Sequence, residues 1–333
     1  MLATTQPTAL HLGTTPWNFD DFSAAALGRQ AALAEQLGYQ SFWLPENHFN
    51  AQAIPDPLML LAACAGLTNR IALATTSYLL TLRNALQAAE QVAVLDQLSQ
   101  GRVILGVGRG YAPTMLAAFK VVTKDKRRIF EDCLNEMILA WSGSKMRVTT
   151  AGAVETPAGT VALGPLPVQK PHPPLWIAAF GPKALTQAGR LGLPYLASPM
   201  ETLAELNDNL GVYRKSYEET WTGREAARLA VQATVPIMRS VFVCDDRRTL
   251  QTVRQSMSQA RGGPSGQVPV PAAEWALVGD AAEVADGIAA YRASLGMTHL
   301  IASRPRVRGL DSALLERSAA QLAELCAVRL SAE

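Results

Sequence analysis

Residues 95–110 constrain the fold of this chain more than any other stretch, because they place a helix end directly before a buried strand. Gly101 ends the predicted helix, an apolar strand is expected at 103–107, and Arg109 follows it between two glycines. A helix that ends on glycine and passes at once into a strand is the joint of an alternating α/β fold. Such folds bind ligands at the carboxyl ends of their strands, which makes Arg109 a candidate anion contact.

Short apolar segments alternate with amphipathic ones along the rest of the chain. We expect strands at 9–13, 41–45, 71–80, 103–107, 175–180, 194–198, 235–243 and 298–302. We expect helices at 22–37, 56–68, 84–98, 128–141, 182–191, 202–220, 247–261, 281–295 and 312–330. Eight strands with intervening helices predict a (β/α)8 TIM barrel, a fold of about 250 residues that lengthens with insertions. An open, doubly wound sheet is the alternative, and the even number of strands favours the barrel.

Two irregular stretches account for the length beyond a minimal barrel. Around 142–174 the chain is rich in glycine and proline, which predicts loops with a hairpin, and a second such stretch spans about 262–276. We interpret both as insertions in a single domain, 1–333, rather than as linkers between domains.

Composition excludes several classes of partner. The net charge of +2 gives no electrostatic basis for binding nucleic acid or a membrane surface. The longest apolar run, 58–67, is shorter than the roughly 20 residues that cross a bilayer, and no signal peptide is evident. Four dispersed cysteines predict reduced core thiols in a cytoplasmic protein. Because the cysteines and histidines lack the spacing of zinc ligands, we expect no metal site.

Polar residues follow the second and third predicted strands, where a barrel places its chemistry. Glu46 and His48 are two apart, and a neutral imidazole moves protons or donates a hydrogen bond near neutral pH. The alternative is that Glu46 pairs with a cation while His48 packs under its loop. Thr76 and Ser77 are suited to bonding the edge of a polar ring, although threonine is also common in strands for its β-propensity.

Candidate phosphate contacts follow the fourth and fifth strands. Glycines beside Arg109 leave room for a ligand, and a guanidinium binds phosphate through two N–H groups. Arg128 opens the next helix and is either a second contact or a solvated surface residue. Gly181 before Pro182 leaves N–H groups free at the positive end of a helix, which favours phosphate, and Phe180 is a candidate wall for a flat ring.

Six segments, taken in order, resemble the bacterial luciferase-like flavin-dependent monooxygenases. They are residues 42–49, 68–75, 89–102, 106–110, 170–179 and 278–280, of which the pattern Leu-Asp-x-Leu-Ser-x-Gly-Arg at 95–102 is the most specific. The resemblance implies a luciferase-like (β/α)8 barrel. It also implies that reduced FMN, or in a sister branch the deazaflavin coenzyme F-420, binds at the barrel mouth.

The resemblance also implies roles for individual residues. Arg109 and Arg128 match phosphate-binding arginines, residues 181–184 match a phosphate loop, and Thr76-Ser77 matches a bulge that often contains a cis peptide bond. Gly108 stands where luciferases have a cysteine. The candidate cofactor-binding residues are therefore Thr76, Ser77, Gly108, Arg109, Arg128, Phe180, Gly181, Lys183 and Ala184.

Luciferases carry two histidines after the acidic residue at the second strand, and the first of them matters for catalysis. Here Asn47 stands at the first position and His48 matches the second, which argues against light emission. The candidate catalytic residues are Glu46, Asn47 and His48, and the candidate substrate-pocket residues are Phe49, Tyr78 and Tyr111.

The function implied is a monooxygenase that uses reduced FMN and oxygen to oxidise a small organic substrate, with a separate flavin reductase as partner. The stretch 262–273 is then expected to cover the site against water. A coenzyme F-420-dependent hydride transfer and a non-catalytic flavin-binding subunit are the alternatives. Alanine-rich helices at 58–67 and 85–93 resemble the family's dimer faces and predict a homodimer, or else they pack within the outer ring.

Overall fold

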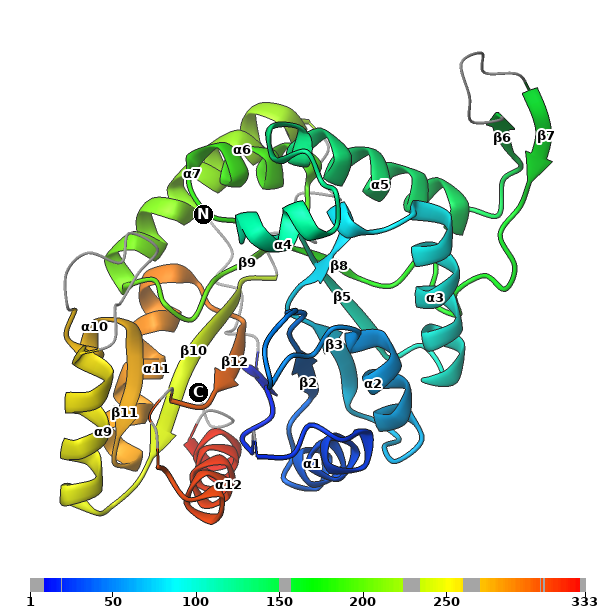
Figure 1. The fold of residues 1–333 in the computed structure, drawn as a ribbon. Coiled ribbons are helices and arrows are strands. Elements are labelled where there is room, and N and C mark those ends of the chain that lie inside the picture. The colour runs from blue at the N-terminus through cyan, green and yellow to red at the C-terminus, as the bar shows by residue number, and fades with distance from the viewer. Residues whose placement is uncertain are drawn as a thin grey trace.

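A curled parallel sheet surrounded by helices forms the body of the protein in the computed structural model (Figure 1). The structure describes residues 9–18, 20–149, 157–223, 234–259, 270–305, 307 and 309–329. The strands are β1 His11–Thr14, β2 Ser41–Leu44, β3 Ala72–Thr75, β4 Tyr78–Leu79, β5 Val103–Gly108, β6 Met146–Thr149, β7 Pro157–Val161, β8 Leu175–Ala178, β9 Tyr195–Leu196, β10 Pro236–Val243, β11 Ala276–Gly279 and β12 His299–Ser303. The helices are α1 Ala24–Gln36, α2 Pro57–Ala65, α3 Ala85–Leu98, α4 Pro113–Ala118, α5 Lys126–Trp141, α6 Pro182–Leu191, α7 Leu203–Trp221, α9 Arg247–Gln259, α10 Ala272–Trp275, α11 Ala281–Leu295 and α12 Ser312–Arg329, with short 3-10 turns at Leu80–Leu82 and Thr123–Asp125.

The sheet closes on itself as a barrel. Parallel pairing runs in the order β10, β12, β1, β2, β3, β5, β8, β9, and a bridge between Ala197 and Ile237 joins the end of β9 back to β10. The eight parallel strands of this ring confirm the predicted TIM barrel, and the open, doubly wound sheet was the wrong alternative.

The structure departs from the predicted elements in three places. The expected strand at 71–80 is two strands, β3 and β4, separated by a cis peptide bond between Thr76 and Ser77. Strand β11 pairs with β10 and was not predicted; it begins where the stretch expected to be irregular, 262–276, ends, and that stretch also contains the unpredicted helix α10. So few apolar residues beside glycine and proline give too short a pattern to recognise. Helix α4 was also not predicted. Residues 260–269 lie outside the described part of the chain, so the expected cover at 262–273 stays a prediction.

The insertion at 142–174 contains the predicted hairpin. Strands β6 and β7 pair antiparallel and project away from the barrel, as Figure 1 shows. The end of the insertion is tied to the barrel by Gln169, whose backbone N–H and side-chain amide both donate to the buried carboxylate of Asp96 (2.9 and 2.8 Å).

The motif at 95–102 is largely structural. Asp96 of this motif binds Gln169, as described above. Arg102, also in the motif, donates to the carbonyls of Ala65, Thr68, Ile71 and Ser99, which fixes the end of α2 and the α3–β5 joint. A helix end without partners for its last carbonyls is unstable when buried, and one guanidinium satisfies several of them here. This joint sets where β5, and therefore Arg109, emerges at the mouth.

The barrel interior is filled rather than open. Trp43 and Trp176 stack with ring centroids 5.0 Å apart, and Met238 and Ile301 pack against them. At the amino ends of the strands lie His11 and His299, whose rings are 4.6 Å apart. Burial lowers the pKa of His11 to about 4, and burial together with His11 lowers the pKa of His299 to about 4. We call this end the floor and the opposite end the mouth.

Candidate active site

Three cations meet at the mouth beside the end of β5. The Arg109 side chain is half-buried, and its Nη1 donates to Oε1 of Gln187 at 3.0 Å. Burial lowers the pKa of Arg109, and the nearby Arg127 lowers it further. Burial also lowers the pKa of Lys126, as do Arg109 and Arg127. Three mutually repelling cations at a strand end form a site that an anion stabilises.

Arg128 does not belong to this group, in contrast to the expectation from its sequence. Its side chain is 67% exposed and its Nη1 bonds to Oδ2 of Asp132 at 3.0 Å, one turn along α5. Arg127 faces Arg109 instead. Neighbouring residues on a helix point about 100° apart, so the run of basic residues at 124–128 did not show which one turns toward the mouth.

The amino end of α6 lies beside these cations, because β5 and β8 are neighbours in the barrel and Gln187 of α6 contacts Arg109. Gly181 has φ +74° and no side chain to cap the helix. Within the described part of the chain, the N–H groups of Gly181 and Lys183 have no protein acceptor. The N–H of Ala184 does have one, since it donates to the Gly181 carbonyl, so Ala184 is not free to bind phosphate as expected.

The glycines of β5 make room for protein rather than for a ligand, which corrects the sequence interpretation. A Cβ at Gly108 would lie 2.2 Å from Oγ of Ser77, and one at Gly106 would lie 2.0 Å from the carbonyl oxygen of Thr75. The cis bond between Thr76 and Ser77, which the resemblance implied, lies at this close approach. The side chains of Thr76 and Ser77 are half-buried there.

The Glu46 carboxylate is completely buried, so it does not face the mouth. Its Oε1 accepts hydrogen bonds from Nη2 of Arg83 (2.6 Å) and Nε2 of His48 (2.9 Å), and its Oε2 accepts from the Leu79 N–H (2.9 Å). The alternative that Glu46 pairs with a cation is therefore the one the structure shows. Sequence reasoning missed Arg83, although a buried carboxylate at a strand end requires such a partner.

Asn47 forms hydrogen bonds within the loop that contains it. Its Oδ1 accepts the N–H of Ile54 at 3.0 Å, and its N–H donates to the Ile54 carbonyl at 3.0 Å. These bonds close the loop that follows β2. The side chain that stands at the position of a luciferase histidine is thus used to hold Phe49 and its neighbours in place.

Aromatic rings surround His48 at the mouth. The His48 ring lies 4.8 Å from Phe119 and 5.7 Å from Phe49, and the two phenylalanine rings are 5.6 Å apart. Phe49 is 71% exposed and has φ +62°, a left-handed conformation that bulky side chains rarely adopt. Strain of this kind is typical of binding sites.

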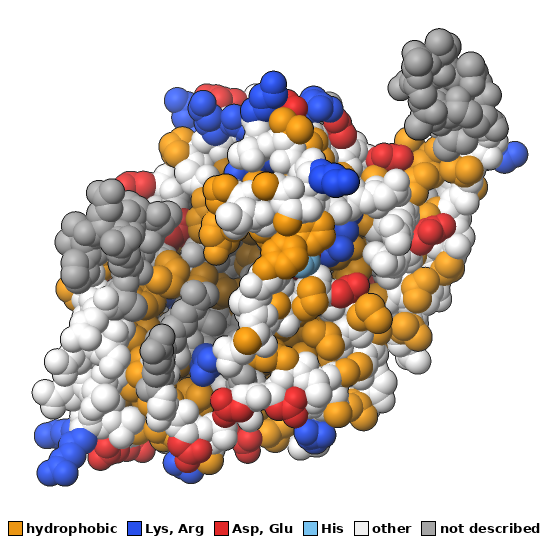
Figure 2. Space-filling model, viewed as in Figure 1, with side chains coloured by type: hydrophobic (Ala, Val, Ile, Leu, Met, Phe, Trp, Pro, Cys, Tyr) orange, Lys and Arg blue, Asp and Glu red, His pale blue; other side chains and the backbone are white. Residues whose placement is uncertain are grey.

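Of the other expected pocket residues, Tyr111 is exposed but Tyr78 is buried. The Tyr78 hydroxyl donates to Gln91 and its ring lies under Arg83, so it is a support and not a wall of the pocket. Phe119 and Val122 are also exposed and were not predicted, and Phe119 packs against His48 and Phe49. Figure 2 shows hydrophobic side chains gathered around a hollow in this face, with cationic side chains beside it.

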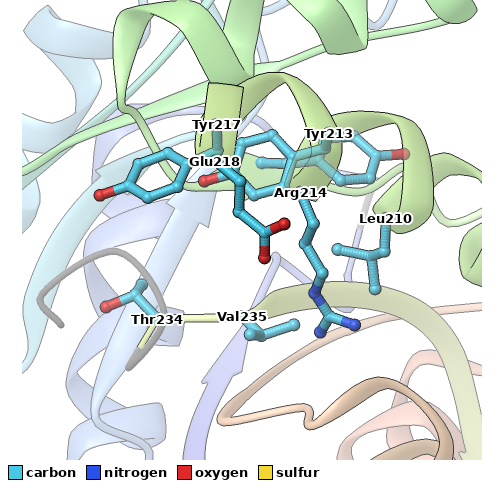
Figure 3. Close-up of a pocket in the computed structure, with 8 residues that line it drawn as sticks. Leu210, Tyr213, Arg214, Tyr217, Glu218, Thr234 and Val235 are labelled. Atoms are coloured by element: carbon cyan, nitrogen blue, oxygen red, sulfur yellow. The ribbon is translucent and has the colours of Figure 1, made fainter. Parts of the chain in front are cut away.

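A cavity of about 260 Å³ lies elsewhere, between α7 and the start of β10 (Figure 3). Arg214 and Glu218 point from α7 toward Val235, below the rings of Tyr213 and Tyr217. None of the predicted site residues lines this cavity. Across the described ranges, the structure contains no cluster of three or more acidic, histidine or cysteine side chains suited to a metal, and no helix long and apolar enough to cross a membrane.

Solved structures with the same fold include enzymes with two different cofactors. The oxygenating constituent of 3,6-diketocamphane monooxygenase from Pseudomonas putida, in complex with FMN, superimposes with a TM-score of 0.75 at 18% identity, covering 96% of this chain and 99% of that one. An F420-dependent secondary alcohol dehydrogenase superimposes with a TM-score of 0.71 at 18% identity, covering 96% and 99%. At this identity the likeness establishes the fold alone.

Sequence comparison identifies the family. The chain is 29% identical over 249 residues to the uncharacterized protein y4vJ of Sinorhizobium fredii, covering 70% of this chain and 69% of that protein. It is 25% identical over 235 residues to the oxygenase component of the flavin-dependent trigonelline monooxygenase of Acinetobacter baylyi, covering 68% and 61%. The chain thus spans about two thirds of these relatives. A family model described as luciferase-like monooxygenase matches residues 1–299. The chain therefore belongs to the luciferase-like monooxygenases, a family of oxidoreductases built on this barrel.

Proposed function

We propose that the protein is the oxygenase of an FMN-dependent monooxygenase system that oxidises a small, largely apolar organic substrate. The observation that carries this proposal is the group of three cations, Arg109, Lys126 and Arg127, beside the uncapped start of α6. A phosphate monoester such as that of FMN bears close to two negative charges, which matches this site. FMN is therefore the cofactor that we propose for this site.

Each part of the mouth then has a role. The cations and the N–H groups of Gly181 and Lys183 hold the phosphate, and Phe180, which is half exposed, lies against the rest of the cofactor. Reduced flavin supplies the activation of oxygen when it is bound. Phe49 and Phe119 exclude water and bind the apolar part of the substrate, while His48 contacts its polar group.

The protein's partners follow from this chemistry. A reduced flavin used as a co-substrate has to be regenerated, and the trigonelline enzyme is named as the oxygenase component of its system. We therefore propose a separate flavin reductase, and with it a cytoplasmic location, which suits four buried and unpaired cysteines. A homodimer through α2 and α3 is also proposed, because these helices expose Met59, Val94 and Leu98, and Leu67 is exposed just after α2.

Anaerobic titration distinguishes the cofactors. Purified protein is mixed with reduced FMN or with reduced coenzyme F-420, and binding is followed by absorbance. We expect tight binding of FMN and at least tenfold weaker binding of F-420. Tighter binding of F-420 than of FMN would overturn the FMN assignment and favour hydride transfer. Hydride transfer is the second candidate function because an F420-dependent secondary alcohol dehydrogenase has the same fold.

Oxygen coupling then tests catalysis. With reduced FMN and air, the enzyme should incorporate one oxygen atom into apolar test substrates, measured by mass spectrometry with labelled oxygen. An FMN complex that releases only hydrogen peroxide with every substrate of a broad panel would instead support the non-catalytic flavin-binding subunit.

A further inference from the structure

We propose that Arg83 and Glu46 are positioning residues that hold His48 as the tautomer protonated on Nε2, so that its unprotonated Nδ1 serves as a proton acceptor at the mouth. This inference rests on the proposed function for the identity of the reaction. The tautomer itself is a property of the protein alone and is tested without flavin.

The tautomer follows from the hydrogen bonds of Glu46. A carboxylate only accepts hydrogen bonds, and its Oε1 already lies 2.6 Å from the Arg83 guanidinium, which only donates. The contact of 2.9 Å between Oε1 and Nε2 of His48 therefore requires a hydrogen on Nε2. In a neutral imidazole the other nitrogen, Nδ1, then carries the lone pair.

The carboxylate is held from three sides, so it has no freedom to release the ring. Oε2 accepts the N–H of Leu79, the second residue of β4. The Arg83 guanidinium lies 4.4 Å above the Tyr78 ring, and Tyr78 is fixed through its bond to Gln91. Nε of Arg83 is buried and has no partner among the described residues, so the polar contact of this guanidinium in that part of the chain is the one to Glu46.

Nδ1 of His48 is left for a ligand. The ring follows β2 at the mouth and packs against Phe49 and Phe119, with 7% of its side chain exposed. In the part of the chain that the structure describes, only Nε2 of this ring has a hydrogen-bond partner. A substrate that lays an apolar surface on the two phenylalanines brings its polar group to Nδ1.

This arrangement specifies a substrate class and a step. The substrate carries a hydroxyl or N–H group beside an apolar or aromatic part. Its O–H or N–H bond breaks, the proton forms a bond to Nδ1, and the electron pair stays on the substrate, which becomes electron-rich toward oxidation. The resulting imidazolium is stabilised by the carboxylate of Glu46, as in other histidine–carboxylate pairs.

Nitrogen NMR of the flavin-free protein tests the tautomer. With 15N-labelled histidine at pH 8, we expect the His48 signals, assigned by their loss in His48→Ala, to show a protonated Nε2 and an unprotonated Nδ1. In Glu46→Gln and Arg83→Gln the share of this tautomer should fall at least fivefold relative to the other, and Arg83→Lys should restore it. A wild-type ring protonated on Nδ1, or an equal mixture, would overturn the inference.

Kinetics provide the second readout. Arg83→Gln should lower kcat by about 10- to 100-fold, part of the roughly 100- to 10,000-fold that a proton-transfer group contributes. It should also change the pH profile of kcat and leave the affinity for reduced FMN unchanged. Arg128→Gln removes the same charge from the exposed face of α5 and is the matched control. A parallel loss of FMN affinity in Arg83→Gln would show a general structural role and overturn the kinetic part. A protein that lacks oxygenase activity but shows the expected tautomer would refute only the proposed function.

Discussion

The two ends of the barrel both hold histidines among aromatic rings, but they place them in opposite environments. On the floor, His11 and His299 lie against each other, and His299 also lies against Trp176. Their nitrogens bond to the hydroxyls of Ser41 and Thr298. At the mouth, His48 bonds to a buried carboxylate. Burial lowers the pKa of both floor histidines, whereas His48 lies beside a carboxylate that accepts its hydrogen bond.

The same contrast holds for the surroundings. At the floor, the two histidines close the barrel interior next to the stacked tryptophan pair. At the mouth, phenylalanine side chains are exposed and three cations lie close together. In TIM barrels the amino end of the strands serves stability and the carboxyl end serves catalysis. Variants at the two ends should therefore affect different measurements.

The largest expected effect is a loss of stability in acid, caused by the two buried histidines at the floor. Because burial lowers the pKa of His11 and His299 to about 4, the unfolded chain binds protons first as the pH falls below 6.5. The free energy of unfolding should fall between pH 6.5 and 4 by up to about 3 kcal/mol per histidine, and no further from these groups below pH 4. Urea titrations across this range measure it.

The double variant His11→Gln, His299→Gln should flatten this pH dependence relative to the wild type. Equal acid sensitivity in the double variant and the wild type would mean that the floor histidines are not the groups that titrate.

Close packing beneath the mouth predicts the next effect. Gly106→Ala places a Cβ 2.0 Å from the Thr75 carbonyl, and it should destabilise the protein by about 3 kcal/mol, as overpacking does. Gly211→Ala, in helix α7 with open space around it, is the control and should add about 1 kcal/mol of helix stability. Chemical denaturation compares the two, and a neutral Gly106→Ala would contradict the close approach of β3 and β5.

Charge at the mouth should control cofactor binding. Arg109→Ala removes a charged hydrogen-bond donor worth about 2 kcal/mol, so the Kd for reduced FMN should rise about 30-fold. Arg128→Ala removes an exposed arginine and should change the Kd less than twofold. Stability should be nearly unchanged in both, and an equal effect of the two variants on FMN binding would refute the placement of the phosphate.

The smallest effect concerns the strained aromatic residue. Phe49→Asn keeps a side chain that tolerates φ +62° but removes the ring, so KM for an apolar substrate should rise about 10-fold, from the loss of about 1.4 kcal/mol of apolar contact. Steady-state kinetics measure this change. A kcat/KM equal to wild type would exclude Phe49 from the pocket.

Much of the fold was predictable because it depends on periodic patterns. Helices α6 and α11 have the expected bounds, and the hairpin of β6 and β7 lies in the predicted insertion. Strand β11 was missed because four residues carry too little periodicity. In the site, Arg109 was identified from its place after a strand, and the cis bond at Thr76-Ser77 came only from the family resemblance.

The sequence by itself determined the order of strands and helices, and with it which residues reach the mouth. Only the tertiary structure decided which way their side chains face: Arg127 and not Arg128 toward Arg109, Glu46 inward to Arg83, and Tyr78 into the core. The physical reason is that hydrophobic periodicity is a local property of the chain. The pairing of a buried charge is not local, because it joins residues that are distant in the sequence. Glu46 and Arg83 are 37 residues apart and meet only when the barrel closes.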